Sequence, residues 1–191
     1  MKKIIALTIA FMFLLLNNKI HSQDALGGLS IESSIPFWLS DGYSVGATYY
    51  TPNSHFSFGS SIEGLTYTNE NLKETVFKNG ENLEQVRLRF LIRTEVRYYL
   101  KMDKEGFYGG VRIGYEEWKI KFKGFEASVD DSFVSPIVGY CWYPWGKKGL
   151  MIHPYLGAIF ILGEGEAILA DETFKLNSIL PNPGIIIGWR I

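Results

Sequence analysis

The sequence predicts an all-β fold, an eight-stranded antiparallel up-and-down transmembrane β-barrel. Apolar and charged residues alternate between Leu88 and Tyr99, and this period of two is typical of a strand whose faces meet different environments. An export leader precedes the alternating segments, and short connections between them alternate with longer polar ones. No segment after the leader is long and apolar enough for a membrane helix. If the exported part spans a bilayer, it must therefore do so with β-strands.

The first 22 residues read as a cleaved signal peptide. Lys2 and Lys3 precede 13 weakly polar to apolar residues, Ile4 to Leu16, which is fewer than the roughly 17 to 25 that a membrane-spanning helix needs. Polar residues follow at once, and we place the cleavage after Ser22. The predicted organisation is a signal peptide over residues 1–22 and one barrel domain over residues 23–191.

Composition excludes several classes of function. The exported part keeps 16 of the 19 basic residues and all 20 acidic ones, so its formal net charge is −4 and it has no basic surplus for nucleic acid. Cys141 is the only cysteine, so no intramolecular disulfide can form. Only His55 and His153 remain, without the spacing of metal ligands, and we expect no metal and no cofactor.

Turn signals divide the exported part into eight strands. The expected strands cover about residues 26–38, 42–51, 55–67, 84–101, 106–122, 133–145, 150–163 and 182–191. The connections at 51–54, 101–106 and 146–149 are short, whereas those at 68–83, 123–132 and 163–181 are longer and polar. Short periplasmic turns and long outer loops are the usual arrangement of outer-membrane barrels. We therefore expect residues 68–83 outside the cell and residues 146–149 in the periplasm.

The first three strands carry small residues on one face and large apolar residues on the other. The small residues are Ser30, Ser34, Ser44, Gly46, Thr48, Ser57, Gly59 and Ser61. They suit the narrow lumen of an eight-stranded barrel, and all ten lysines of the exported part lie in turns, loops or strand ends. We expect a polar interior and an apolar exterior. A soluble periplasmic lipocalin-like binding barrel, with the opposite polarity, is an alternative.

The fourth and fifth strands supply most charges of the expected lumen. The expected lumen charge network is Arg87, Arg89, Arg93, Glu95, Arg97, Arg112, Glu116, Glu32 and Glu63. An unpaired charge in so narrow a space is costly, so we predict salt bridges that plug the lumen. A bulge at Glu116–Glu117 is expected to keep Trp118 on the apolar side of the fifth strand.

The last three strands contain the weakest and the clearest strand signals. Pro136 and Pro154 lie near the starts of the sixth and seventh strands, where a missing N–H does least harm. The final strand places Ile185, Ile187 and Trp189 on its apolar side.

Aromatic residues gather near both ends of the expected strands. The expected aromatic girdle is Trp38, Tyr49, Tyr98, Trp118, Trp142, Trp145 and Trp189. Such girdles mark the two interfaces of a membrane barrel. Ordinary enrichment of aromatic residues in strands is the alternative explanation.

One motif suggests an enzyme. His55-Phe56-Ser57 is similar to the His-x-Ser motif of the outer-membrane lipid A deacylases, with Glu63 as the candidate third member. Base, nucleophile and orienting carboxylate are the parts that acyl transfer needs. The motif follows a short turn on the expected periplasmic side, whereas that family acts at the outer surface. The deacylase-like esterase is therefore an alternative, and we expect no catalytic residue.

As a whole, residues 25–191 resemble the small eight-stranded outer-membrane barrels, a group that includes the transmembrane domain of OmpA and the OmpX-type proteins. The resemblance rests on the alternating segments and on the terminal strand from Gly184 to Ile191, which ends on Ile where the group usually has Phe. It implies a monomeric, non-enzymatic protein in the outer membrane of a Gram-negative bacterium, with a structural or surface-interaction role. Outer-membrane lipids and the barrel-assembly machinery would be its partners, and it names no ligand for the surface loops.

Overall fold

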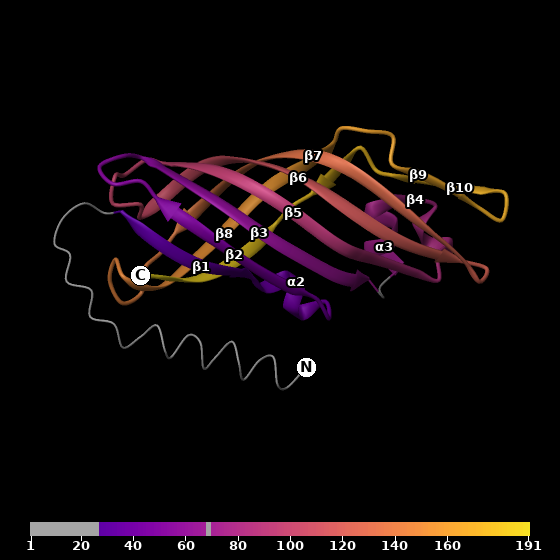
Figure 1. The fold of residues 1–191 in the computed structure, drawn as a ribbon, viewed down its shortest axis with the longest axis horizontal. Coiled ribbons are helices and arrows are strands. Elements are labelled where there is room, and N and C mark those ends of the chain that lie inside the picture. Colours follow the sequence, from indigo (N-terminus) through magenta and orange to yellow (C-terminus); the bar gives the residue numbers. More distant parts are fainter. Residues whose placement is uncertain (1–26, 68–69) are drawn as a thin grey trace.

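The structure is a closed antiparallel barrel, which confirms the predicted fold class (Figure 1). The computed structural model describes residues 27–67 and 70–191, so the predicted signal peptide lies outside the described residues. The eight wall strands are β1 (Gly28–Ser34), β2 (Tyr43–Tyr50), β3 (Phe56–Tyr67), β5 (Gln85–Tyr99), β6 (Gly106–Phe122), β7 (Phe125–Cys141), β8 (Gly149–Ile161) and β12 (Gly184–Arg190). Each strand pairs with its neighbours in sequence, and β12 pairs with β1 to close the wall. Within the described residues, no helix is long and apolar enough to cross a membrane.

Most smaller elements gather at the end of the barrel that carries the longer connections (Figure 1). They are α2 (Ile35–Leu39), α3 (Glu70–Val76), β4 (Phe77–Lys78), the 3-10 turn η1 (Gly80–Asn82), β9 (Glu166–Leu169), β10 (Glu172–Leu176) and β11 (Ile179–Pro181). Strands β4, β10 and β9 form a small second sheet. Strand β11 pairs with β8 in the same register as β12, so β11 and β12 are one wall strand interrupted at Asn182 and Pro183. The opposite end holds three short turns.

Two expected connections have a different form in the structure. The first expected strand ends at Ser34, because Pro36 lies in the first turn of helix α2, where its missing N–H costs nothing. The expected loop at 123–132 is a continuation of β7. Lys123 and Gly124 form its two-residue turn, and both have positive φ, 49° and 80°, as the tight turns of β-hairpins require.

The bulge lies in β5, so the predicted bulge at Glu116–Glu117 in β6 is wrong. Leu88 pairs with Trp118, but Phe90 pairs with Glu117, which leaves Arg89 as the extra residue. The bulge reverses the faces of β5: Leu88 is buried inside, whereas Phe90 turns toward the outer face. Strand β6 keeps one parity throughout, so Trp118 points inward with a 3% exposed side chain.

The wall reverses its radial polarity along β6 and β7. Toward the short-turn end, outward residues such as Val111 and Ile113 are apolar, and inward ones such as Arg112 are polar. Beyond Tyr115 the pattern inverts: Lys119 points outward and Ile120 inward. An outward apolar surface suits lipid, and an outward charged surface suits water. The inversion marks the level at which the outer surface of the wall changes from apolar to charged.

An apolar core closes the long-loop end of the barrel. We call this the cap core. Its buried members are Leu65, Val76, Phe77, Leu83, Val86, Leu88, Leu91, Trp118, Ile120, Phe122, Val129, Phe133, Leu169, Phe174 and Leu176. They come from the ends of β3, β5, β6 and β7, from α3, β4, β9 and β10, and, for Leu83, from the residue after η1. The long connections therefore fold back over the barrel mouth as part of one packed core.

The polarity inversion can be located with spin labels at Ile113 and Lys119, which both lie on the outer face of β6. In lipid bilayers we expect the label at 113 to be accessible to oxygen and the label at 119 to a water-soluble nickel complex, as measured by power saturation. Equal accessibility to the nickel complex at both positions would contradict a membrane boundary near Tyr115.

Candidate functional site

Three arginines and three glutamates meet in the middle of the lumen. Alternate residues of β5 supply Arg93, Glu95 and Arg97, β6 supplies Arg112, β1 supplies Glu32 and β3 supplies Glu63. Each of the six is at most 7% exposed. The formal charges are equal and opposite, as burial of so many ionised groups requires.

Arg97 connects the largest part of this group. Its Nη2 donates to Glu32 Oε2 at 2.7 Å and also to Glu95. The second oxygen of Glu95 accepts from Arg112 Nε at 2.8 Å. One chain of ion pairs therefore joins β1, β5 and β6 across the lumen, and charge-assisted hydrogen bonds of this kind fix side-chain geometry.

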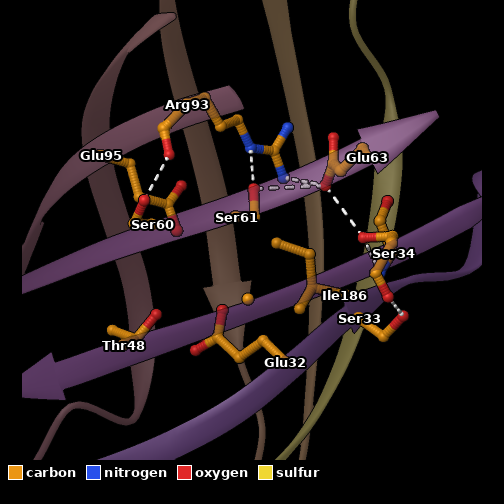
Figure 2. A pocket seen from close by; sticks show the side chains of 12 residues that line it. Glu32, Ser33, Ser34, Thr48, Ser60, Ser61, Glu63, Arg93, Glu95 and Ile186 are labelled. Carbon is orange, nitrogen blue, oxygen red and sulfur yellow. Dashed lines mark hydrogen bonds and ion pairs between the residues drawn. The ribbon is translucent and has the colours of Figure 1, made fainter. Parts of the chain in front are cut away.

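Arg93 and Glu63 form a second ion pair nearer the cap core. Arg93 Nη2 lies 2.9 Å from Glu63 Oε1, and Arg93 Nε donates to Ser61 Oγ at 2.9 Å (Figure 2). Ser44 donates to the same glutamate oxygen at 2.9 Å. The cavity among these side chains measures about 10 Å³, which is about the space of a single water molecule.

Tyrosine rings fill the rest of the polar lumen. The Arg112 guanidinium stacks on Tyr155 with 4.0 Å between its carbon and the ring centroid, a favourable cation–π geometry. A Cβ at Gly139 would lie 2.5 Å from the ring and hydroxyl atoms of Tyr108, and a Cβ at Gly184 would lie 2.5 Å from the hydroxyl of Tyr155. Glycines therefore face this lumen because the rings opposite them occupy the space.

His153, which the sequence pattern did not assign to the lumen, is fully buried beside Arg97. His153 Nδ1 lies 3.4 Å from Arg97 Nη1, and its Nε2 lies 3.0 Å from Cys141 Sγ. A guanidinium can only donate, so Nδ1 accepts and the proton sits on Nε2, facing the sulfur. The odd-numbered positions of β8 all face inward, and counting parity from Met151 would have revealed the position.

Arg190, near the short-turn end of the lumen, was also not predicted to lie there. Its guanidinium lies over the ring of Tyr50 at 4.3 Å, and Nη1 donates to the Tyr143 hydroxyl at 3.0 Å. Strand β12 places its even-numbered residues inward, and this parity is the signal that could have identified Arg190.

Three predicted site residues lie elsewhere than predicted. Arg87 and Arg89 are exposed on the outer face, and Arg89 pairs there with Glu117, because the bulge in β5 turns this segment over. Their assignment to the lumen was wrong. Trp118 is buried in the cap core and donates to Glu116 at 2.7 Å, so its assignment to the girdle was also wrong. Glu116 itself is buried between the central charges and the cap core.

The other predicted girdle residues lie on the outside of the molecule. Tyr49 and Tyr98 are exposed on wall strands near the short turns. Trp142 is exposed directly after β7, Trp145 lies in the turn that follows, and Trp189 is half-buried. Trp38 is exposed on α2 at the opposite end.

The esterase residues are not assembled into a triad. His55 stacks on Tyr98, which is exposed on the outer wall, whereas Ser57 is completely buried on the lumen side of β3. Glu63 Oε1 is bonded to Arg93 and Ser44. Among residues 27–67 and 70–191, no group of three or more His, Cys, Asp or Glu side chains could hold a metal ion.

A separate ion-pair cluster joins two of the short turns. Lys147 Nζ lies 2.5 Å from Asp103 Oδ2 and 2.6 Å from Glu105 Oε2. Burial alone would raise the pKa of Asp103, but hydrogen bonds from the Lys147 ammonium and the Glu105 N–H outweigh burial and hold this pKa below 3.8. Burial would lower the pKa of Lys147, and its two carboxylate partners instead raise that pKa above 10.5. The cluster fastens the β5–β6 turn to the β7–β8 turn.

We expect Arg97→Ala to lower the free energy of unfolding by about 3–5 kcal/mol, because Glu32 and Glu95 would be left buried without a cation. Arg89→Ala removes an arginine from the same strand, but its ion pair is exposed and should contribute at most about 1 kcal/mol. Urea unfolding in detergent measures both. Equal destabilisation by the two variants would show that the lumen charges are not coupled.

We expect Lys147→Met to cost about 0.2–1 kcal/mol near neutral pH, since the ion pairs are partly exposed. The folded pKa of Asp103 is depressed, so its contribution is present above pH 3.8 and disappears as the pH falls through the lower folded value. Unfolding free energies of wild type and variant should therefore converge in acid. Lys148→Met, in the same turn, is the control and should show no such convergence.

Comparisons with known proteins agree with the barrel architecture. The N-terminal β-barrel domain of Pseudomonas aeruginosa OprF superposes with a TM-score of 0.51 at 11% identity, covering 86% of this chain and 99% of that one. Neisserial surface protein A superposes with a TM-score of 0.50 at 8% identity, covering 86% of this chain and 94% of that one. No family model and no curated protein matches the sequence. At such low identity the likeness shows the fold alone, that of the small eight-stranded outer-membrane barrels.

Proposed function

We propose that this protein is a monomeric, integral barrel of a Gram-negative outer membrane that crosses the bilayer with its eight strands. The proposal rests on an apolar belt, the outward-facing apolar residues of the wall between Tyr115 and the short turns. Within this belt Val111, Ile113, Val138 and Leu156 are each about half exposed or more. Exposed apolar surface on this scale is unusual for a soluble monomer. The same belt argues against the lipocalin-like alternative, whose apolar face would lie inside.

In this proposal, side chains plug the lumen completely. The central ion pairs fill the middle, and the cap core fills the long-loop end, so two barriers of different chemistry lie in series. An eight-stranded barrel encloses little more than its own side chains. A role in membrane integrity, or in contacts made by the long connections, suits such an object better than transport.

The proposed topology places the cap core outside the cell and the short turns in the periplasm, as is usual for barrels of this class. A non-enzymatic role is supported by the separation of His55 from Ser57 across the wall. The last strand of the barrel, β12, has an apolar outer face on which Ile185 is exposed. Such a strand is suited to recognition by the barrel-assembly machinery.

The plug predicts that the wild-type protein, inserted into planar bilayers, gives no steady conductance above that of the bare bilayer. Insertion is checked independently by the slower or faster migration of the unboiled protein on gels and by a β-rich circular dichroism spectrum. Steady ohmic conductance of the inserted protein would show that the charged lumen is an open pore. A native form soluble without detergent would contradict the membrane proposal itself.

The proposed topology can be tested with epitope tags. One is inserted at Asn79, between β4 and η1 at the long-loop end, and the other at Lys148, in a short turn. On intact cells we expect antibody to reach only the tag at Asn79, and after permeabilisation both tags. Exclusive labelling at Lys148 would show the inverse orientation.

A further inference from the structure

A basic cleft lies on the outer surface of the wall. It has a volume of about 400 Å³ and is lined by Arg87, Arg89, Lys119 and Ser128. The bulge in β5 produces it, because this bulge turns both arginines outward, and the Arg89 side chain is 63% exposed. The cleft lies immediately beyond Phe90 and Tyr115, whose ring centroids are 5.9 Å apart. These two rings belong to the last row of the apolar belt.

The protein balances the three cations of the cleft only in part. Arg87 lies directly opposite Lys119 across the β5–β6 ladder, and like charges in this position destabilise a sheet. Glu117 pairs with Arg89 at 2.8 Å, and Glu126 pairs with Lys119 at 2.5 Å. Within the described residues, no carboxylate forms an ion pair with Arg87.

The other charged groups nearby are already engaged. Glu84 lies 3.7 Å from Lys121, one row further from the belt. Asp130 accepts the Tyr115 hydroxyl at 2.9 Å, below the cleft. The opposed cations Arg87 and Lys119 therefore give the cleft an excess of positive charge that an external anion could neutralise.

We propose that this cleft binds the phosphate group of a membrane lipid headgroup. The two guanidinium groups and the ammonium can only donate hydrogen bonds, and the Ser128 hydroxyl can donate one as well. The planar guanidinium group also matches the spacing of phosphate oxygens. The exposed pairs Arg89–Glu117 and Lys119–Glu126 are weak enough to share their donors with a stronger anion. The proposal rests on the proposed function, because only a barrel in a bilayer holds this cleft at headgroup level.

A lipid phosphate fits better than a free anion because of the position of the cleft. Aromatic rings of membrane barrels sit at the interface, close to the headgroups. A phosphate directly beyond Phe90 and Tyr115 would leave its acyl chains beside the apolar belt. The cleft and the belt together thus match the two parts of one lipid.

The experiment reconstitutes the protein in phosphatidylcholine bilayers and measures the association of spin-labelled phosphatidic acid relative to spin-labelled phosphatidylcholine. We expect selectivity for phosphatidic acid in the wild type and a loss of about fivefold for each cation removed in Arg87→Gln and Lys119→Gln. Addition of inorganic phosphate to the buffer should leave the selectivity unchanged.

The chain offers a matched control. Lys78 and Lys175 also oppose each other across a ladder, between β4 and β10, but in the small sheet of the cap, at the far end of the molecule (Figure 1). Lys78→Gln with Lys175→Gln should keep the wild-type selectivity. In uncharged detergent, Arg87→Gln with Lys119→Gln should be about as stable as wild type, because it removes a like-charge contact together with the exposed Lys119–Glu126 ion pair.

The outcomes separate the two proposals. A protein that does not insert into bilayers fails the proposed function, whatever its lipid selectivity. An inserted protein whose cleft variant keeps full selectivity for phosphatidic acid, or whose cap variant loses as much, overturns the lipid site. Displacement of the lipid by inorganic phosphate would overturn the assignment to a lipid and indicate a site for free anions.

Discussion

The chain of ion pairs centred on Arg97 is the interaction on which the rest of the barrel depends. A guanidinium that is fully buried must keep its carboxylates, so Glu32 on β1 and Glu95 on β5 have to stay within hydrogen-bond reach of it. This requirement fixes which face of each of these strands is inside. Because the side-chain period of a strand is two, a slip of one residue would place the whole set on the apolar outer face of the wall.

The same constraint explains where the wall changes character. Polar side chains are tolerated inside only where partners surround them, and apolar ones are tolerated outside only where water is absent. Between Tyr115 and the short turns, the central charges inside have ion-pair partners and the outer face is apolar. Beyond Tyr115, Lys119 meets water and Ile120 meets the cap core. In β6 the even-numbered residues face inward throughout, and it is the residue types on the two faces that change. In β5 the bulge at Arg89 instead changes which residues face inward, from even-numbered to odd-numbered.

Alternation in the sequence was sufficient for the strand count, the closed architecture and the inward position of Arg93, Arg97 and Arg112. It was not sufficient for the bulge, because Leu88 and Phe90 are both apolar and either face accepts them until the cap core is known. Residues 125–132 resemble a loop in the sequence because Asp130 and Ser132 are common turn residues. In the structure both residues lie on the exposed outer face of β7. The packing of the cap depends on contacts between distant segments, which no local pattern records.

In the proposed plug, the central ion pairs and the cap core differ in what each can exclude. The central ion pairs stop a passing ion by geometry and charge, but they are polar and can share their hydrogen bonds with water. The cap core has no such capacity, because Phe77, Phe174 and Leu176 present only apolar surface, and burying it is favourable only if it stays dry. A water-filled path would therefore have to break the packing of α3, β4 and β10 before it reached the charges. The apolar end protects the charged middle from competing water, and the charged middle holds the strands in the register that the apolar end needs.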